Sequence, residues 1–339
     1  MRSRLSLMVV CLLPFFDGCA TPPAAKPAVK LQPEAALSPS RVEKMREPLE
    51  VTPLELHFSG LRGVAKADES VSVKNTSGED VQVADVRVVG THATTFKILS
   101  PPQLPLMLRP GASFSFSVGF QPDADAEPGV HHARVRLLRS EEDDGPPCDL
   151  TGLVTKGQHP TDEPPLQQVL EALGYDVDVG SKALVLPAEG AMGDAIKATR
   201  FQRAKPGNVG YYLLARYTQK EESSFGYYLV QHDEPITKPI GSAGKEQCQT
   251  LNPELDGESQ TSFDPDDKAF GLYLKVGKRM LYSDDDVPGG AAKGAARIYP
   301  LRSRGRTLVQ DAFLVAFDED GNGDFQDHVF MLWNVKPSP

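Results

Sequence analysis

The sequence predicts an all-β protein with two successive domains: a β-sandwich, then a second β-sandwich or barrel-like domain with one short helix. Two observations carry this prediction. Apolar and polar residues alternate along many short segments, which is the period of a half-buried strand. Gly, Pro, Asn and Asp separate these segments at short intervals, and one segment alone has a convincing helical period.

The first residues have the composition of an export signal. Arg2 and Arg4 precede the apolar run 5–16, which is too short for a stable membrane anchor of about 20 residues. We therefore expect residues 1–18 to be a signal peptide and the protein to be exported.

The residues around Cys19 resemble the lipobox of bacterial lipoproteins. Gly18 directly precedes the cysteine, whereas Phe16 and Asp17 depart from the usual pattern. The resemblance implies that the Cys19 thiol is acylated. Ala20 after it implies sorting to the outer membrane, on either its periplasmic or its surface face. Cleavage after Ala20 without a lipid, which would release a secreted protein, is the competing interpretation.

A segment rich in Pro and Ala follows the signal. Residues 19–48 include TPPAAKPAVKLQPEAALSPS, which has little apolar periodicity. Proline-rich chains extend by about 3.1 Å per residue. We expect a tether that holds the folded part away from the membrane in which the Cys19 lipid is anchored.

The composition restricts the partners of the protein. The chain has 36 Lys and Arg against 46 Asp and Glu, a net charge of −10. An acidic chain is poorly suited to bind phosphate backbones, so nucleic acid is not expected as a partner. Cys148 and Cys248 remain as structural cysteines. An oxidising envelope would permit a disulfide between them, but they fall in different predicted domains, so free buried thiols are the alternative.

Residues 49–156 are expected to form the first sandwich. Every second residue of Ser113–Phe120 is apolar. Similar runs occur at 54–58, 71–75, 81–89, 133–138 and 149–154. About seven short strands in about a hundred residues, without a helical period, are typical of an immunoglobulin-like (Ig-like) sandwich.

Particular residues of this region resemble the ASH (ASPM, SPD-2, Hydin) type of Ig-like domain. They are Asn75 at a strand end, Phe96, Pro110-Gly111 and Phe120-x-Pro122. The resemblance implies a non-catalytic spacer or interaction module.

Residues 161–337 are expected to form the second domain. One helix face is spaced at i, i+3, i+4 and i+7: Leu166, Val169, Leu170 and Leu173. Thr161 or Asp162 can cap this helix and Gly174 can end it. Strands are expected at 183–186, 198–203, 210–218, 225–231, 269–276, 279–282, 297–301, 307–317 and 327–335. The stretch 233–267 has few periodic apolar residues, so a long functional or mobile loop is expected there.

An acidic segment near the C-terminus is the strongest candidate metal site. Its oxygen-bearing side chains are Asp318, Asp320, Asn322, Asp324 and Asp327. Their spacing is that of the first half of an EF-hand loop. Val329 stands where an EF-hand has its bidentate Glu, and the flanks have the period of strands. We therefore predict a Ca²⁺-binding β-hairpin loop, with a tight Asp/Asn/Gly turn that binds no cation as the alternative.

The same segment resembles the C-terminal signature of DUF4114-type domains of bacterial surface proteins. The matching residues are Glu319, Asp320, Gly323, Asp324, Phe325 and Asp327. The resemblance implies an acidic segment that leads into the final strand of such a domain.

The sequence contains none of the common catalytic templates. It has no Gly-x-Ser-x-Gly, His-Glu-x-x-His or Cys-x-x-Cys, and no catalytic residues are expected. We expect a non-catalytic envelope lipoprotein that binds a glycan or an envelope protein, or acts as a scaffold. A hydrolase with its site on the loops of the second domain is the alternative, and a structural component of an envelope assembly is the third.

Overall fold

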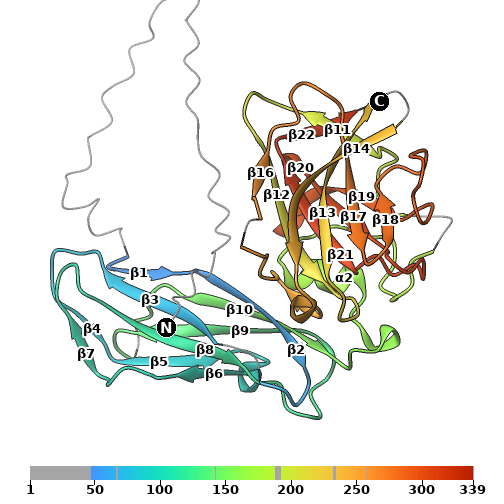
Figure 1. Cartoon of the computed structure of the whole chain (residues 1–339). Helices are drawn as coiled ribbons and strands as arrows, with labels where there is room; N and C mark the ends of the chain where they lie inside the picture. Colours follow the sequence, from blue (N-terminus) through green and yellow to red (C-terminus); the bar gives the residue numbers. More distant parts are fainter. Residues whose placement is uncertain are drawn as a thin grey trace, which may run out of the picture.

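The computed structural model describes residues 47–65, 68–141, 143–187, 192–231, 234–257 and 259–338. The predicted signal peptide, Cys19 and the tether up to residue 46 lie outside the described residues. Within the described ranges the chain forms two β-sandwiches, drawn in blue to green and in green to red in Figure 1. No helix in these ranges is long and apolar enough to cross a membrane.

The first sandwich contains the strands β1 to β10. Their bounds are β1 Leu49–Thr52, β2 Glu55–Leu61, β3 Glu69–Asn75, β4 Val81–Val83, β5 Asp85–Val89, β6 Phe96–Leu99, β7 Leu106–Leu108, β8 Ser113–Phe120, β9 Gly129–Leu138 and β10 Cys148–Thr155, with the 3-10 turn η1 at Ala93–Thr95. One sheet has the order β1-β3-β8-β6 and the other β2-β10-β9-β5, and β4 pairs with β7. β2 and β10 run parallel.

The core of this sandwich follows the alternation in the sequence. In β8, Phe116, Val118 and Phe120 are buried while Ser115 is exposed. The Phe120 ring packs against those of Phe58 and Phe96, with centroids 5.8 and 5.3 Å away. Burying side chains of this size contributes about 1.5–3 kcal/mol each, so these aromatic contacts hold the two sheets together.

Asn75 completes the end of β3. Its side chain is buried, and its Nδ2 donates to the carbonyl oxygens of Leu108 at 2.9 Å and Glu79 at 2.8 Å. Its Oδ1 accepts from the backbone N–H of Ser77 at 2.9 Å. A buried amide with these partners explains why an Asn stands where the strand turns.

The second sandwich contains the strands β11 to β22 and one helix. The strands are β11 Arg200–Arg203, β12 Val209–Arg216, β13 Ser223–Gln231, β14 Glu234–Ala243, β15 Thr250–Leu251, β16 Ser262–Phe263, β17 Gly271–Val276, β18 Arg279–Tyr282, β19 Ala296–Ser303, β20 Thr307–Phe317, β21 His328–Trp333 and β22 Val335–Ser338. Three 3-10 turns are η2 Pro160–Asp162, η3 Lys245–Gln247 and η4 Arg304–Arg306. One sheet has the order β15-β12-β21-β20-β19 with β16 also on β12, the other is β14-β13-β17-β18, and β11 pairs with β22. Among the described strands these sheets do not close into a barrel, so the second domain is a sandwich.

The predicted helix is α2, Leu166–Ala172. Its apolar face packs against the outer side of the sheet that contains β20 and β21, in one cluster with Leu314 and Met331. Gly174 ends it with φ +79°, a conformation that favours glycine. The expected cap is wrong: Thr161 and Asp162 lie in η2, and Pro165 occupies the N-cap position.

Two other expectations for this domain are wrong. Residues 183–186 form no strand, and the segment bends so that the backbone N–H of Leu186 donates to the Gly323 carbonyl oxygen at 2.7 Å. The stretch 233–267 contains the ten-residue strand β14 as well as β15 and β16. β14 is an edge strand with Pro235 and Pro239, which edge strands tolerate and which hide the alternation.

The two sandwiches contact each other directly. Leu153 of β10 is buried in the same cluster as Leu170 of α2. His57 Nδ1 lies 2.7 Å from the Ala172 carbonyl oxygen. The connector from β10 to α2 is the segment 156–165. Cys148 and Cys248 are buried and free, so no disulfide joins the domains.

Candidate metal centre

The acidic segment forms the loop between β20 and β21. These strands pair antiparallel from Ala312↔Trp333 to Phe317↔His328. Residues 318–327 therefore connect adjacent strands, and the hairpin expected at this position is present.

The first half of the loop uses its side chains to hold its own shape. Asp318 Oδ1 accepts from the backbone N–H of Asn322 at 3.1 Å, and Oδ2 accepts from that of Gly323 at 2.8 Å. Asp320 forms an ion pair with Arg279 at 2.6 Å. Carboxylates engaged in this way act as turn-forming groups.

The second half of the loop joins a residue from far away in the sequence. Asp324 and Asp327 lie beside Glu163 of the connector, and one carboxylate oxygen of each lies within 4.8 Å of the others. The three side chains are buried, with exposed fractions of 1%, 4% and 7% for Asp324, Asp327 and Glu163. Buried carboxylates are rare unless they are paired or coordinate a metal. We call these three residues the acidic centre.

Two buried amides contact the acidic centre. Gln249 Nε2 donates to Glu163 Oε1, and Gln326 Nε2 donates to Glu163 Oε2 at 3.2 Å. The exposed fractions of Gln249 and Gln326 are 6% and 0%. Their Oε1 atoms, like Asp324 Oδ1, have no hydrogen-bond partner among the described residues. Because an unsatisfied buried acceptor costs about 1–3 kcal/mol, these oxygens are available to accept a hydrogen bond or to coordinate a cation.

Burial disfavours the charged form of all three carboxyl groups. It raises the pKa of Glu163 to about 7 and raises the pKa of Asp324 and Asp327, and the charges of neighbouring carboxylates raise them further. A nearby cation favours the ionised form and offsets both effects. The acidic centre therefore favours either protonated carboxyl groups or a bound cation.

A buried basic network lies next to the centre. Arg216 Nε donates to His328 Nε2 at 3.2 Å, and both side chains are fully buried. His328 Nδ1 lies 3.6 Å from Glu319 Oε2, and Glu319 also accepts from Thr218 Oγ1. Burial and the neighbouring Arg216 charge lower the pKa of His328 well below its usual range. The neutral form of this histidine is therefore favoured.

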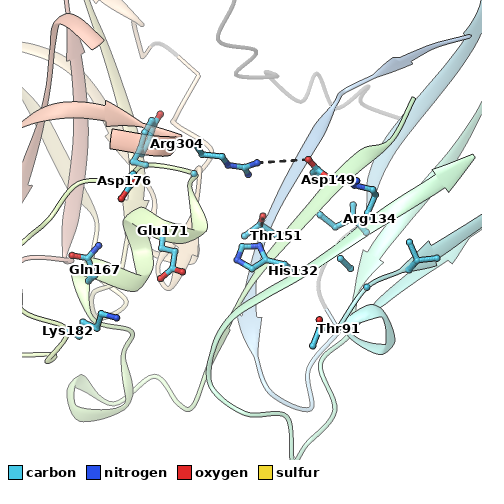
Figure 2. A pocket seen from close by; sticks show the side chains of 17 residues that line it. Thr91, His132, Arg134, Asp149, Thr151, Gln167, Glu171, Asp176, Lys182 and Arg304 are labelled. Carbon is cyan, nitrogen blue, oxygen red and sulfur yellow. Dashed lines mark hydrogen bonds and ion pairs between the residues drawn. The ribbon is translucent and has the colours of Figure 1, made fainter. Parts of the chain in front are cut away.

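A second feature is the cleft between the domains, of about 830 Å³ (Figure 2). His132, Asp149 and Thr151 line its side on the first sandwich. Glu171 and Arg304 face them from the second, and Arg304 reaches Asp149 at 4.0 Å. Its walls carry charges of both signs, so the cleft is suited to a polar ligand.

The sequence could not identify Glu163 or Gln249. Glu163 precedes Pro164 and Pro165 in a polar connector, and Gln249 lies in a stretch without periodicity. Neither has a local pattern that marks a ligand, because the fold alone brings them to the loop. Gln326 lies between two predicted ligands, and its position inside the acidic motif was the one available signal.

Fold and site together define a two-domain β-sandwich protein with a buried acidic centre at the domain joint. No family model matches the chain, and no curated protein matches it in sequence. Several solved structures are similar to it at low identity.

One such structure is the ASH/PapD-like domain 7 of human CEP192, with 14% identity, a TM-score of 0.25, and 39% of this chain and 99% of that one covered. The secreted serine protease VesC from Vibrio cholerae has 10% identity and a TM-score of 0.28, with 89% of this chain and 53% of that one covered. A Porphyromonas gingivalis W83 protein of unknown function has 10% identity and a TM-score of 0.26, with 84% and 83% covered. At these identities and TM-scores the similarities carry no functional argument.

Proposed function

We propose that the protein is a non-catalytic binding or scaffolding module of the bacterial cell envelope, and that Ca²⁺ stabilises its C-terminal domain. The observation that carries this proposal is the acidic centre with its two unsatisfied amide oxygens. The ligands are then Glu163, Asp324 and Asp327, with Gln249 and Gln326 beside them, while Asp318, Asp320 and Asn322 shape the loop.

The donor set favours calcium over other divalent ions. It consists of carboxylate and amide oxygens, without Cys or His at the centre. Ca²⁺ takes 6–8 oxygen ligands in flexible geometry, whereas Mg²⁺ demands an octahedron and Zn²⁺ prefers nitrogen and sulfur. Extracellular modules commonly bind Ca²⁺ with dissociation constants of about 10⁻⁴–10⁻³ M, which fits a protein of the envelope.

Two buried histidines, His328 and His131, support a non-catalytic role. The pair that most resembles a catalytic dyad, His328 and Glu319, has exposed fractions of 0% and 4%, so a substrate cannot reach it. His131 is also buried, and its ring nitrogens contact Thr95 Oγ1 at 3.0 Å and the Glu127 carbonyl oxygen at 2.8 Å. Both histidines thus serve the packing of their domains.

The proposal includes the anchor and the ligand. A lipid on Cys19 would attach the module to the outer membrane through the Pro-rich tether, and an ASH-like first domain would act as a spacer. The cleft between the domains offers a polar surface to a glycan or an envelope protein. Mass spectrometry of the mature N-terminus tests the lipid, because an acylated Cys19 is heavier than a free one and cleavage after Ala20 would remove it.

Calcium is expected to raise the melting temperature of the full chain, and EGTA to lower it. At a calcium concentration of about 100 times Kd, binding to the folded state contributes about 2.7 kcal/mol. For a domain of this size that corresponds to a shift of roughly 5–10 °C. Differential scanning calorimetry in calcium, in magnesium and in EGTA measures it.

Two variants and a control locate the site. In Glu163→Gln the calcium shift is expected to disappear, while the stability in EGTA is at least that of the wild type because one buried charge is gone. Asp320→Asn, which alters only the ion pair with Arg279, should keep the shift. So should Glu254→Gln, the same substitution at an exposed position. No shift in the wild type at about 10–100 mM calcium, which is 100 times the Kd of such modules, would exclude the proposed calcium role.

A further inference from the structure

The acidic centre lies at the joint between the two domains. Glu163 belongs to the connector 156–165, which leads from β10 of the first sandwich to α2 of the second. Asp324 and Asp327 belong to a loop of the second sandwich. A cation bound by all three would therefore fasten the connector to the second domain.

A second link leads from the centre to the first domain. Gln249 contacts Glu163 and donates to the Thr218 carbonyl oxygen at 3.0 Å. Two residues later, the backbone N–H of Leu251 donates to Ser59 Oγ of β2 at 2.9 Å, in a buried position. Gln249 thus joins the acidic centre to a hydrogen bond that crosses the domain interface.

The charge of the acidic centre affects the stability of both links, the one through the connector and the one through Gln249. Three ionised carboxylates within 4.8 Å repel one another, and burial weakens the screening by water. When all three carboxyl groups are ionised, this repulsion acts against the contacts of Glu163 with Gln249 and Gln326. A divalent cation placed between the three carboxylates attracts each of them and offsets their mutual repulsion.

The apolar contact of Leu153 with Leu170 and the contact of His57 with the Ala172 carbonyl oxygen also cross the interface. The ion pairs of Arg304 with Glu55 and Asp149 cross it as well, but they lie near the surface, where such pairs contribute little.

We propose that the cation at the acidic centre sets the arrangement of the two domains. With calcium bound they form one rigid body. Without it they move separately about the connector 156–165, and the cleft between them loses its fixed shape. This inference rests on the proposed calcium site and adds a function to it: calcium controls the geometry of the surface that both domains present to a partner.

The test compares the tumbling of the two domains in the full chain. Nitrogen-15 relaxation of backbone amides in β8 and β21 gives a rotational correlation time for each sandwich. In calcium the two values should agree. In EGTA the β8 value is expected to fall to roughly half, because a body of one domain's size then tumbles almost alone.

Two variants distinguish the coupling of the two domains from the binding of calcium. Ser59→Ala removes the interdomain hydrogen bond between Leu251 and Ser59 and leaves the carboxylates unchanged. It should keep the calcium shift in melting temperature while its β8 correlation time in calcium becomes shorter than in the wild type. In Glu163→Gln the correlation times should no longer respond to calcium, whereas Glu254→Gln should behave as the wild type.

The outcomes distinguish the two proposals. A calcium shift in melting temperature together with equal correlation times in calcium and EGTA overturns the control of domain arrangement and leaves the calcium site in place. The absence of any calcium shift overturns both. Correlation times that separate in EGTA and converge again when calcium is restored support both.

Discussion

Replacing Arg216 with leucine is expected to destabilise the second domain by about 3–5 kcal/mol, the usual cost of removing one partner from a buried charged network. The Arg216 side chain is fully buried, and it donates to the Gly244 carbonyl oxygen at 2.7 Å, to the Glu221 carbonyl oxygen and to His328. Leucine fills part of the volume but leaves these acceptors unsatisfied. It also removes one of the two positive charges that act on buried Glu319, the other being Arg279 at 3.9 Å.

Urea unfolding followed by circular dichroism measures this change. Arg136→Leu is the matched control, because Arg136 pairs with Asp144 at 2.7 Å on the surface of the first sandwich, where both side chains are more than one-third exposed. Such pairs contribute about 0–1 kcal/mol. A loss in Arg216→Leu no larger than in this control would show that the buried network adds little to stability.

Replacing Gly210 with valine is expected to cost about 3 kcal/mol, the upper end of the usual range for overpacking. Gly210 lies opposite Trp333 in the pairing of β12 and β21, and the indole ring covers it. A Cβ at this position would lie 1.6 Å from Trp333 Cε2. The ring would have to leave its stack on Tyr212, whose centroid is 4.7 Å away.

Tryptophan fluorescence reports this displacement directly, because Trp333 is the single tryptophan of the chain. We expect a red-shifted emission together with the lower unfolding midpoint. Gly257→Val is the control, since a Cβ there meets nothing within 4 Å, and it should change stability by less than about 0.5 kcal/mol. If the overlap is the cause, adding Trp333→Ala to Gly210→Val should cost less than the sum of the two single changes; strictly additive losses would contradict it.

The alternation of apolar residues was sufficient to predict the all-β class and strands such as β8 and β20. The alternation did not predict β14, because Pro235, Pro239 and small residues stand where apolar residues would be expected in this edge strand. Its place in the sheet depends on backbone hydrogen bonds to β13, which leave no trace in side-chain pattern. The helix was visible since its four apolar residues cover one face, whereas its N-terminus depends on a 3-10 turn that local capping residues did not reveal.

The candidate site was predictable in part for a similar reason. The loop motif drew attention to Asp324 and Asp327, which do lie together, but motif spacing treats all its carboxylates as equivalent. All of them take part in hydrogen bonds or ion pairs at the loop, including Asp327, which accepts from the Glu319 backbone N–H at 2.6 Å. What distinguishes Asp324 and Asp327 is that they are buried beside Glu163. Glu163 completes the group from a distance of more than 150 residues in sequence, which no single-sequence pattern encodes.

The parallel pairing of β2 with β10 has a mechanical consequence. Consider a force that pulls the N-terminal end of the first sandwich away from the second domain. Once β1 has detached, this force acts on the first residue of β2 and on the last residue of β10. Since the two strands run side by side in the same direction from Asp149↔Glu55 to Thr155↔Leu61, this load shears all their hydrogen bonds at once rather than unzipping them singly. The first sandwich is thus built to bear tension along its length.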